Sequence, residues 1–299
     1  MKKAKRKFGR SVISSMGEGD LNASLFSSPA VERGSGRQVS QSWLSACTAQ
    51  RTLTIGLLDK AMEPVNLLRS YRRVMSNKGS AGVDGMEVKD LKGWISKNFD
   101  GLRAKILECS YRPQAVRGVE IPKPNGGKRQ LRIPTVIDRM VQQAIYQVLS
   151  PEYDDSFSEH SYGFRPKRNA HQGLNTAARY VESGKNWVVD LDLEKFFDEV
   201  NHDRLMWLLS TRIGDKRILK LIRKYLQSGM MQGGLTNQRI KGTPQGSPLS
   251  PLLSNIVLDE LDKELERRGL SYVRYADDIK IFCGSSIAAQ RAKENITGY

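Results

Sequence analysis

The sequence has few cysteines and no long hydrophobic run. Its three cysteines, Cys47, Cys109 and Cys283, are far apart, and no cluster of histidines accompanies them. They therefore indicate neither a disulfide framework nor a zinc site, which fits a reducing compartment. No stretch reaches the roughly 18 apolar residues that a membrane span needs, and no apolar signal segment follows the basic first ten residues. These absences exclude the membrane and secreted classes, and we expect a cytoplasmic protein.

What the sequence has in excess is positive charge. Its 299 residues include 48 Lys and Arg against 32 Asp and Glu, a net charge of +16, and 39% of them are hydrophobic. That length and composition are enough for a globular protein with a sizeable core. Residues 1–130 hold +13 of the +16. An uneven basic surface is typical of a protein that binds a polyanion such as nucleic acid, and a generally soluble surface is the alternative.

The spacing of apolar and turn-forming residues predicts an α+β fold. Residues 1–60, rich in Gly and Ser, indicate a flexible basic leader. Further along, helices and strands alternate irregularly, which argues against a doubly wound sheet. Helices are predicted at 64–78, 91–99, 102–107, 170–181, 203–212, 215–227 and 249–268, with another one capped by Asp138. Strands are predicted at 116–121, 129–133, 187–193, 271–275 and 279–283, with a loop or hairpin at 229–242.

Two pairs of aspartates stand out because each lies in or beside an apolar strand. Asp277 and Asp278 form a turn between two predicted strands, where they repel each other unless a cation lies between them. Asp190 and Asp192 alternate along a strand, so both lie on one face of it. Carboxylates from neighbouring strands can hold the two magnesium ions that phosphoryl transfer to a nucleotide requires. For Asp277 and Asp278 alone, an exposed turn is the alternative.

Several ordered motifs resemble those of reverse transcriptases. The Tyr275-Ala276-Asp277-Asp278 sequence resembles the YxDD box, 192–198 resembles the first catalytic motif, and 242–251 resembles the PQG-S-PxL box. Four further segments are similar to bacterial group II intron-encoded proteins, the maturase–reverse transcriptases: 121–124, 132–139, 162–166 and 197–202. The resemblance extends over residues 67–282.

The resemblance implies a right-hand polymerase. It assigns fingers to 61–186, with a template-contacting segment at their N-terminal end, and a palm with an antiparallel sheet to 187–299. The family continues past the YxDD hairpin into a primer grip, a helical thumb and an intron-binding domain. Because the sequence stops 21 residues after Asp278, we expect a fingers–palm portion that is truncated before the thumb.

The resemblance also implies the catalytic residues. Asp192, Asp277 and Asp278 correspond to the family's metal-binding carboxylates, with the main-chain carbonyl of Leu193 beside them, and the expected cofactor is a pair of Mg²⁺ ions, for which Mn²⁺ can substitute. Asp190 competes with Asp192, but the five-residue step from Asp192 to Phe197 fits the family pattern better.

Further residues are expected to contact substrate and RNA. Lys123 and Arg129 would grip the deoxynucleoside triphosphate, Phe197 would exclude a 2′-hydroxyl, and Gln245 would line the nucleotide and template pocket. Four cations correspond to a template-contacting segment: Arg69, Arg72, Arg73 and Lys78. The alternatives are a solvated hairpin tip, a core phenylalanine, a loop glutamine and a solvated helix face, respectively.

The resemblance therefore implies an RNA-directed DNA polymerase, a nucleotidyltransferase encoded by a group II intron. The expected partners are the intron RNA, whose splicing and mobility the protein would assist, and an RNA template with a DNA primer and dNTPs. The sequence leaves an oligomer open. One alternative is a retron-type or diversity-generating transcriptase, against which the 121–124 and 132–139 segments argue. Another is a splicing factor with a vestigial site, against which the three intact aspartates argue.

Overall fold

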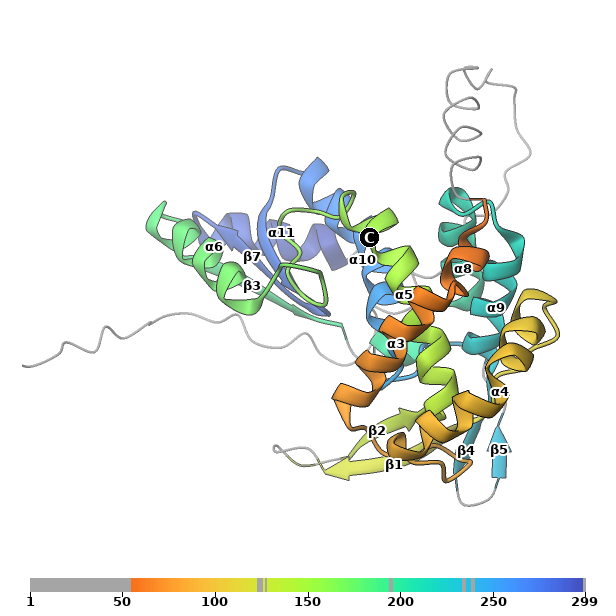
Figure 1. Cartoon of the computed structure of the whole chain (residues 1–299). Helices are drawn as coiled ribbons and strands as arrows, with labels where there is room; N and C mark the ends of the chain where they lie inside the picture. Colours follow the sequence, from red (N-terminus) through yellow and green to blue (C-terminus); the bar gives the residue numbers. More distant parts are fainter. Residues whose placement is uncertain are drawn as a thin grey trace, which may run out of the picture. The chain divides into compact units, whose positions relative to one another are not determined.

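The computed structural model describes residues 55–122, 126, 128–193, 196–232, 235–237 and 240–297 (Figure 1). These residues divide into two units, a first one within 158–193 and 258–297 and a second one within 55–157 and 196–257. Each contains helices and one small sheet, so the predicted α+β class is confirmed. The predicted fingers, 61–186, and palm, 187–299, are each one continuous range of the chain, whereas each unit consists of separate ranges. The division into fingers and palm therefore stays a prediction. Most of the predicted leader, residues 1–54, lies outside the described residues.

The first unit contains a three-stranded antiparallel sheet. Its strands are β3 (Trp187–Asp192), β6 (Ser271–Tyr275) and β7 (Asp278–Cys283), in the order β3-β7-β6. The predicted strands at 187–193, 271–275 and 279–283 are thus confirmed to within one residue. The central strand, β7, pairs with β3 so that Asp192 lies opposite Asp278. It pairs with β6 through a short hairpin that joins Tyr275 to Asp278.

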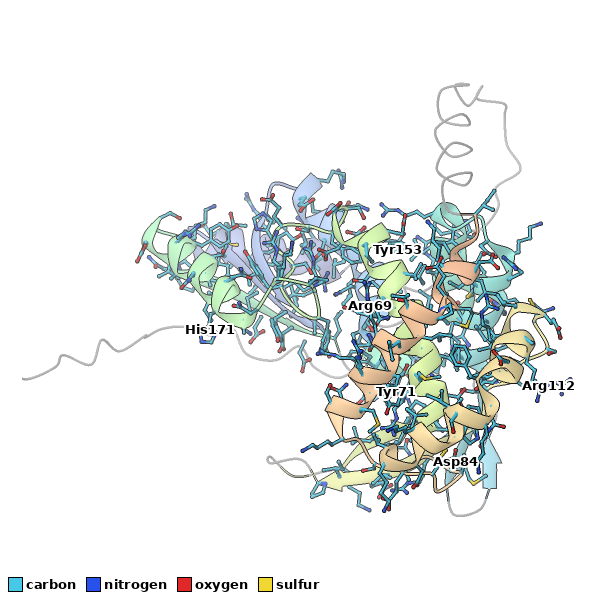
Figure 2. All side chains as sticks on the ribbon, in the orientation of Figure 1. Arg69, Tyr71, Asp84, Arg112, Tyr153 and His171 are labelled. Carbon is cyan, nitrogen blue, oxygen red and sulfur yellow. The ribbon has the colours of Figure 1, made fainter. Side chains whose placement is uncertain are left out.

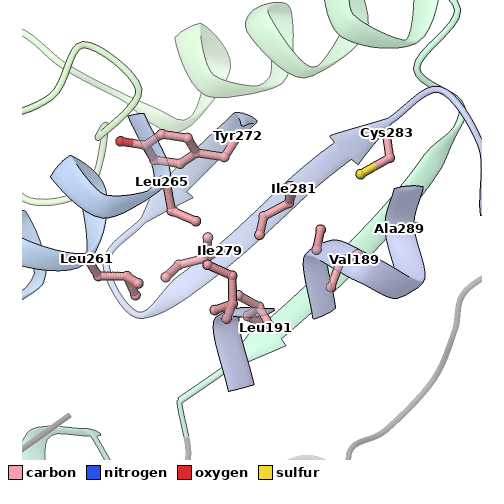
Figure 3. Close-up of a cluster of buried hydrophobic side chains, with 11 residues drawn as sticks. Val189, Leu191, Leu261, Leu265, Tyr272, Ile279, Ile281, Cys283 and Ala289 are labelled. Atoms are coloured by element: carbon pink, nitrogen blue, oxygen red, sulfur yellow. The ribbon is translucent and has the colours of Figure 1, made fainter. Parts of the chain in front are cut away.

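Helices cover one face of this sheet. The alternation of side chains along each strand determines which residues point to that face. Val189, Leu191, Ile279 and Ile281 point to this face and are almost fully buried. They pack against the end of α10 (Ser250–Arg267) and against α11 (Ser286–Thr297), a helix that the sequence did not predict (Figure 3). The cluster consists of Val189, Leu191, Leu261, Leu265, Tyr272, Ile279, Ile281, Cys283, Ala289, Ala292 and Ile296.

The opposite face of the same sheet is covered at one end only. There α6 (Ala170–Glu182) lies over β6 and β7, with the Tyr180 ring 5.4 Å from that of Phe282 and Gly173 close to the Val273 side chain. At the other end, toward the β6–β7 hairpin, this face carries exposed charged side chains instead. The half-covered face is therefore where polar chemistry can take place.

The second unit surrounds a buried helix. Here α5 (Val136–Asp154) has buried residues on every side along its first half, and α3 (Pro64–Asn77) packs against it. The other helices of this unit are α2 (Leu57–Ala61), η1 (Val88–Asp90), α4 (Leu91–Leu107), α7 (Phe196–Glu199), α8 (His202–Arg212), α9 (Lys216–Gln227) and the start of α10. Its sheet has the order β2-β1-β4-β5, formed by β1 (Val116–Pro122), β2 (Lys128–Ile133), β4 (Met230–Gln232) and β5 (Leu235–Asn237).

The prediction that Asp138 caps α5 is wrong. The helix begins at Val136, and the Thr135 hydroxyl accepts the hydrogen bond from the Asp138 N–H at 3.1 Å. Asp138 lies one turn inside the helix, where its carboxylate accepts bonds from Tyr111 at 2.7 Å and from the Thr135 hydroxyl at 2.8 Å. Burial raises the pKa of Asp138 above its usual range. Its role is therefore to join segments inside the core.

Among the helices of the described residues, none combines the length and the apolar character needed to cross a membrane.

Candidate active site

The YxDD sequence forms a two-residue hairpin loop. Tyr275 ends β6, Asp278 begins β7, and the loop consists of Ala276 and Asp277. Ala276 has a φ of 59°, whereas Asp277 is not among the described residues with positive φ. A positive φ at the first loop residue alone is the pattern of a type II′ turn, which favours glycine at that position. The alanine before the aspartates is thus held in a conformation that costs an ordinary residue free energy.

The two strands that carry the aspartates bring two carboxylates face to face. Asp192 at the end of β3 lies directly opposite Asp278 at the start of β7, and both side chains are exposed. In an antiparallel pair, residues directly opposite each other have Cβ atoms about 4.5–5.5 Å apart and project from the same face. Two like charges in such a pair are destabilising, so this arrangement favours a cation between them.

Asp190 and Asp192 differ in their cross-strand partners. Asp190 lies opposite Lys280 in the same register, and the Lys280 ammonium contacts the Asp190 carboxylate at 2.6 Å. Asp190 is therefore already neutralised by its own partner on the same face. Of the two aspartates on β3, only Asp192 lies opposite another carboxylate.

The third carboxylate, Asp277, comes from the hairpin loop and is half-buried. Within the described part of the chain, no three His, Cys, Asp or Glu side chains are close enough together to hold a metal ion by themselves. The structure thus brings Asp192 and Asp278 together; Asp277, which directly precedes Asp278 in the chain, does not form one three-ligand cluster with them. An all-oxygen donor set of this kind fits Mg²⁺, which usually binds one or two carboxylates together with water and substrate phosphates.

Two of the predicted nucleotide-binding residues lie in the second unit. Phe197 is half-buried in α7, whereas its neighbour Phe196 is 3% exposed, so Phe196 is the core residue of the pair. The Phe197 carbonyl accepts a bond from Thr243 N at 2.6 Å, which ties α7 to the loop that contains Gln245. Gln245 is half-buried, and its carbonyl accepts a bond from Arg132 N at 2.9 Å. The roles predicted for Phe197 and Gln245 stay predictions.

The structure describes the remaining predicted residues to different extents. Lys123 lies outside the described residues; Arg129 pairs with Ile121 across the predicted hairpin through its backbone. Leu193 follows β3 and packs its side chain against the buried cluster of the first unit. The four predicted RNA-binding cations are exposed along α3 and at its C-terminal end, where Figure 2 labels Arg69.

The structure also reveals residues near the hairpin that the sequence did not single out as functional. Gly163 packs so closely on the hairpin loop that a Cβ atom at this position would lie 2.3 Å from the Ala276 nitrogen. On β6, the Arg274 side chain is fully buried and forms an ion pair with Asp262 of α10. A charged residue on the apolar face of a strand, together with one of opposite charge in the apolar stripe of a nearby helix, is the signal that could have identified this pair.

This geometry of paired aspartates beside a strained hairpin agrees with the comparisons with known proteins. A family model described as reverse transcriptase (RNA-dependent DNA polymerase) matches residues 121–297. The chain belongs to the reverse transcriptase family.

The relatives point to one branch of that family. Group II intron-encoded protein LtrA of Lactococcus lactis is 36% identical over 195 residues, which cover 65% of this chain and 32% of LtrA. Protein YkfC of Escherichia coli is 38% identical over 221 residues, covering 72% of this chain and 58% of YkfC. Nuclear intron maturase 3 of Arabidopsis thaliana is 30% identical over 46% of this chain and 19% of that protein. The predicted resemblance to group II intron-encoded proteins is confirmed, although the chain spans only part of each relative's length.

Solved structures support the fold. A chain of a partial Cas6-RT-Cas1–Cas2 complex aligns with a TM-score of 0.52 and 24% identity, over 80% of this chain and 41% of the other. At this level of identity the likeness shows a shared fold.

The contact between Gly163 and the hairpin predicts a local effect on stability. We expect Gly163→Ala to lower the free energy of unfolding by about 1–3 kcal/mol, because the added methyl group overlaps the Ala276 backbone, which has little freedom to move. Gly284→Ala is the matched control in the same unit, since a Cβ atom there meets nothing within 4 Å. Denaturant unfolding of both variants measures the difference, and equal midpoints would contradict the close packing of Gly163.

Proposed function

We propose that this chain carries the nucleotidyl-transfer centre of an RNA-directed DNA polymerase encoded by a group II intron, and that the protein also binds its intron RNA to assist splicing. The observation that carries the proposal is the pairing of Asp192 with Asp278 on the open end of the sheet. Membership of the reverse transcriptase family and similarity to group II intron-encoded proteins support the same function.

The chain's own residues suit this chemistry. Asp192, Asp278 and Asp277, with the Leu193 carbonyl, would hold two Mg²⁺ ions, with Mn²⁺ as a substitute. When bound, such ions lower the pKa of the attacking hydroxyl and stabilise the charge on the leaving pyrophosphate. The sheet orients the carboxylates: Asp192 and Asp278 project from one face because they lie opposite each other in the register, and Asp277 lies in the hairpin loop directly before Asp278 in the chain. The fixed backbone of two paired strands keeps these oxygens ready before substrate arrives.

Substitution of the paired aspartates tests this assignment. Asp192→Asn and Asp278→Asn should each slow primer extension on an RNA template on the order of 100- to 1,000-fold, as expected when one electrostatic contact to the transition state is removed. The same substitutions should leave the unfolding midpoint of the metal-free protein unchanged or raise it, because each removes the repulsion between two facing carboxylates.

Asp190→Asn is the matched control, because Asp190 lies two residues before Asp192 on the same face of the same strand. It loses an ion pair with Lys280 whose two side chains are 46% and 47% exposed, so its cost in stability is small. We expect primer extension near the wild-type rate. The assignment is wrong if Asp190→Asn stops extension while Asp192→Asn does not.

Sugar selection is proposed for Phe197. Its half-buried ring, next to the buried Phe196, is available to pack under the C2′ atom of an incoming nucleotide. Phe197→Val should therefore increase the incorporation of ribonucleotides relative to dNTPs, with little loss of dNTP incorporation. Phe196→Leu, which perturbs the core beside it, should leave the ratio unchanged. An unchanged ratio in Phe197→Val would return Phe197 to the role of a packing residue.

RNA binding without polymerisation is the second candidate function, and the charge of α3 favours it. Arg69, Arg72 and Arg73 are exposed on a helix that contains no acidic residue, and the exposed Lys78 follows its end. These cations would contact phosphates of the intron RNA or of the template. Binding of this kind releases counterions and therefore weakens as the salt concentration rises.

A salt titration distinguishes this surface from net charge in general. Replacing Arg69, Arg72 and Arg73 with Ala should weaken binding of group II intron RNA and reduce its dependence on log salt by about 0.7 for each lost contact. The control replaces three exposed lysines of α4, Lys92, Lys97 and Lys105, with Ala. Equal losses from both triple variants would contradict a specific role for α3. Binding by the Asp277→Ala, Asp278→Ala double variant should equal that of the wild type.

A further inference from the structure

The β6–β7 hairpin is anchored by a buried charged side chain. Arg274 lies on the covered face of β6, and its side chain is fully buried together with that of Asp262 on α10. Its Nε donates to the Asp262 carboxylate at 2.8 and 3.0 Å, and its Nη2 donates at 2.5 Å. Asp262 thereby compensates the charge of the guanidinium and fixes its plane, because an arginine fork and a carboxylate match in shape.

The guanidinium has a third contact, and this one reaches the hairpin loop. Its Nη1 donates to the Ala276 carbonyl at 3.0 Å. That carbonyl belongs to the same planar peptide group as the Asp277 N–H, so holding its oxygen fixes the orientation from which the Asp277 side chain departs. Ala276 is also the loop residue with a φ of 59°, a conformation that a non-glycine residue keeps only where its surroundings impose it.

The backbone around the loop is held from the other side as well. Tyr162 N donates to the Arg274 carbonyl, and Arg274 N donates to the His160 carbonyl, both at 2.9 Å. The next residue, Gly163, touches the Ala276 nitrogen closely enough to exclude a side chain. In turn, the buried Arg165 donates to the carbonyls of Ser158 and Ser161 at 2.6 and 3.1 Å, which holds this segment in place.

We propose that Arg274, held by Asp262, is a positioning residue: it fixes the Ala276–Asp277 peptide so that Asp277 and Asp278 face Asp192. The proposal rests on the polymerase function proposed above. Stability alone does not account for the pair, since a buried ion pair contributes little to stability compared with well-packed apolar side chains of similar volume. The contact to Ala276 is the part of the arrangement that an apolar pair cannot replace.

Replacing the whole pair tests this role without leaving an unpaired buried charge. Arg274→Met combined with Asp262→Leu keeps the volume and removes the donor to Ala276. We expect the unfolding midpoint to stay within a few degrees of wild type, while kcat for primer extension falls about 100-fold, as for a displacement of about 1 Å at a reacting centre. KM for dNTP should change by less than about threefold, and Mn²⁺ affinity, measured by electron paramagnetic resonance without substrate, should fall.

Two further variants separate positioning from a merely structural role. Arg274→Lys keeps a charge for Asp262 but replaces the three contacting nitrogens with one, so it should fold and still show a reduced kcat and Mn²⁺ affinity. The control, Arg268→Met with Glu264→Leu, removes another ion pair of the same unit, between Glu264 of α10 and Arg268 just after its end, and it should retain both values.

The outcomes are distinct. A folded Arg274→Met, Asp262→Leu variant, or a folded Arg274→Lys variant, with wild-type kcat and Mn²⁺ affinity would overturn the positioning role. If wild-type protein incorporates no dNTP, the proposed polymerase function fails, and the Mn²⁺ affinities of the same variants still decide whether Arg274 positions the carboxylates.

Discussion

The register in which β3 pairs with β7 is the constraint on which the candidate site depends. It places Asp192 opposite Asp278 and Asp190 opposite Lys280. A slip of one residue would turn the aspartates of β3 into the covered face, and a slip of two would place Asp190 opposite Asp278. The buried side chains of Val189 and Leu191 resist the first slip, because they must stay against α10 and α11. The same apolar packing that stabilises the sheet therefore selects the carboxylates that meet.

In the hairpin that carries Asp277, by contrast, the arrangement is not the most stable one available. The hairpin combines local backbone strain with a buried ion pair, where apolar packing would be more stable. Ala276 adopts a left-handed conformation, Gly163 leaves room for its backbone, and the Arg274–Asp262 pair holds its carbonyl. Each feature costs free energy or removes a side chain from the core. They all act on one residue, Ala276, which directly precedes the aspartates. Such concentration of strain is typical of functional sites, where the geometry of a few atoms matters more than stability.

Much of this could be predicted from the sequence because strands alternate with a period of two. That period placed Asp190 and Asp192 on one face, and short apolar runs bounded by turn residues predicted the three strands of the sheet. The choice between the two aspartates needed the cross-strand partner: Lys280 neutralises Asp190, and sequence alone does not give the register that makes them neighbours. The resemblance to a family favoured Asp192 for a different reason, the spacing to Phe197.

Other features could not be predicted because they arise from long-range contacts. Asp138 looked like a helix cap, but Thr135 provides the cap, and Asp138 is buried among partners distant in sequence. The anchoring of the hairpin depends on Gly163, which is far from it along the chain, and on Asp262, which lies on the preceding helix, α10. The helix α11 was missed even though its inner face completes the core of the sheet.

The most direct test of the account is to locate bound metal in crystals of this chain grown with Mn²⁺ and a non-hydrolysable dNTP. The anomalous signal of Mn²⁺ identifies the ion independently of any activity. The account predicts that a peak lies between the carboxylates of Asp192 and Asp278, with Asp277 as the next nearest protein oxygen donor, and that Asp190 remains paired with Lys280. Mn²⁺ bound by Asp190, or bound away from the facing pair, would contradict it.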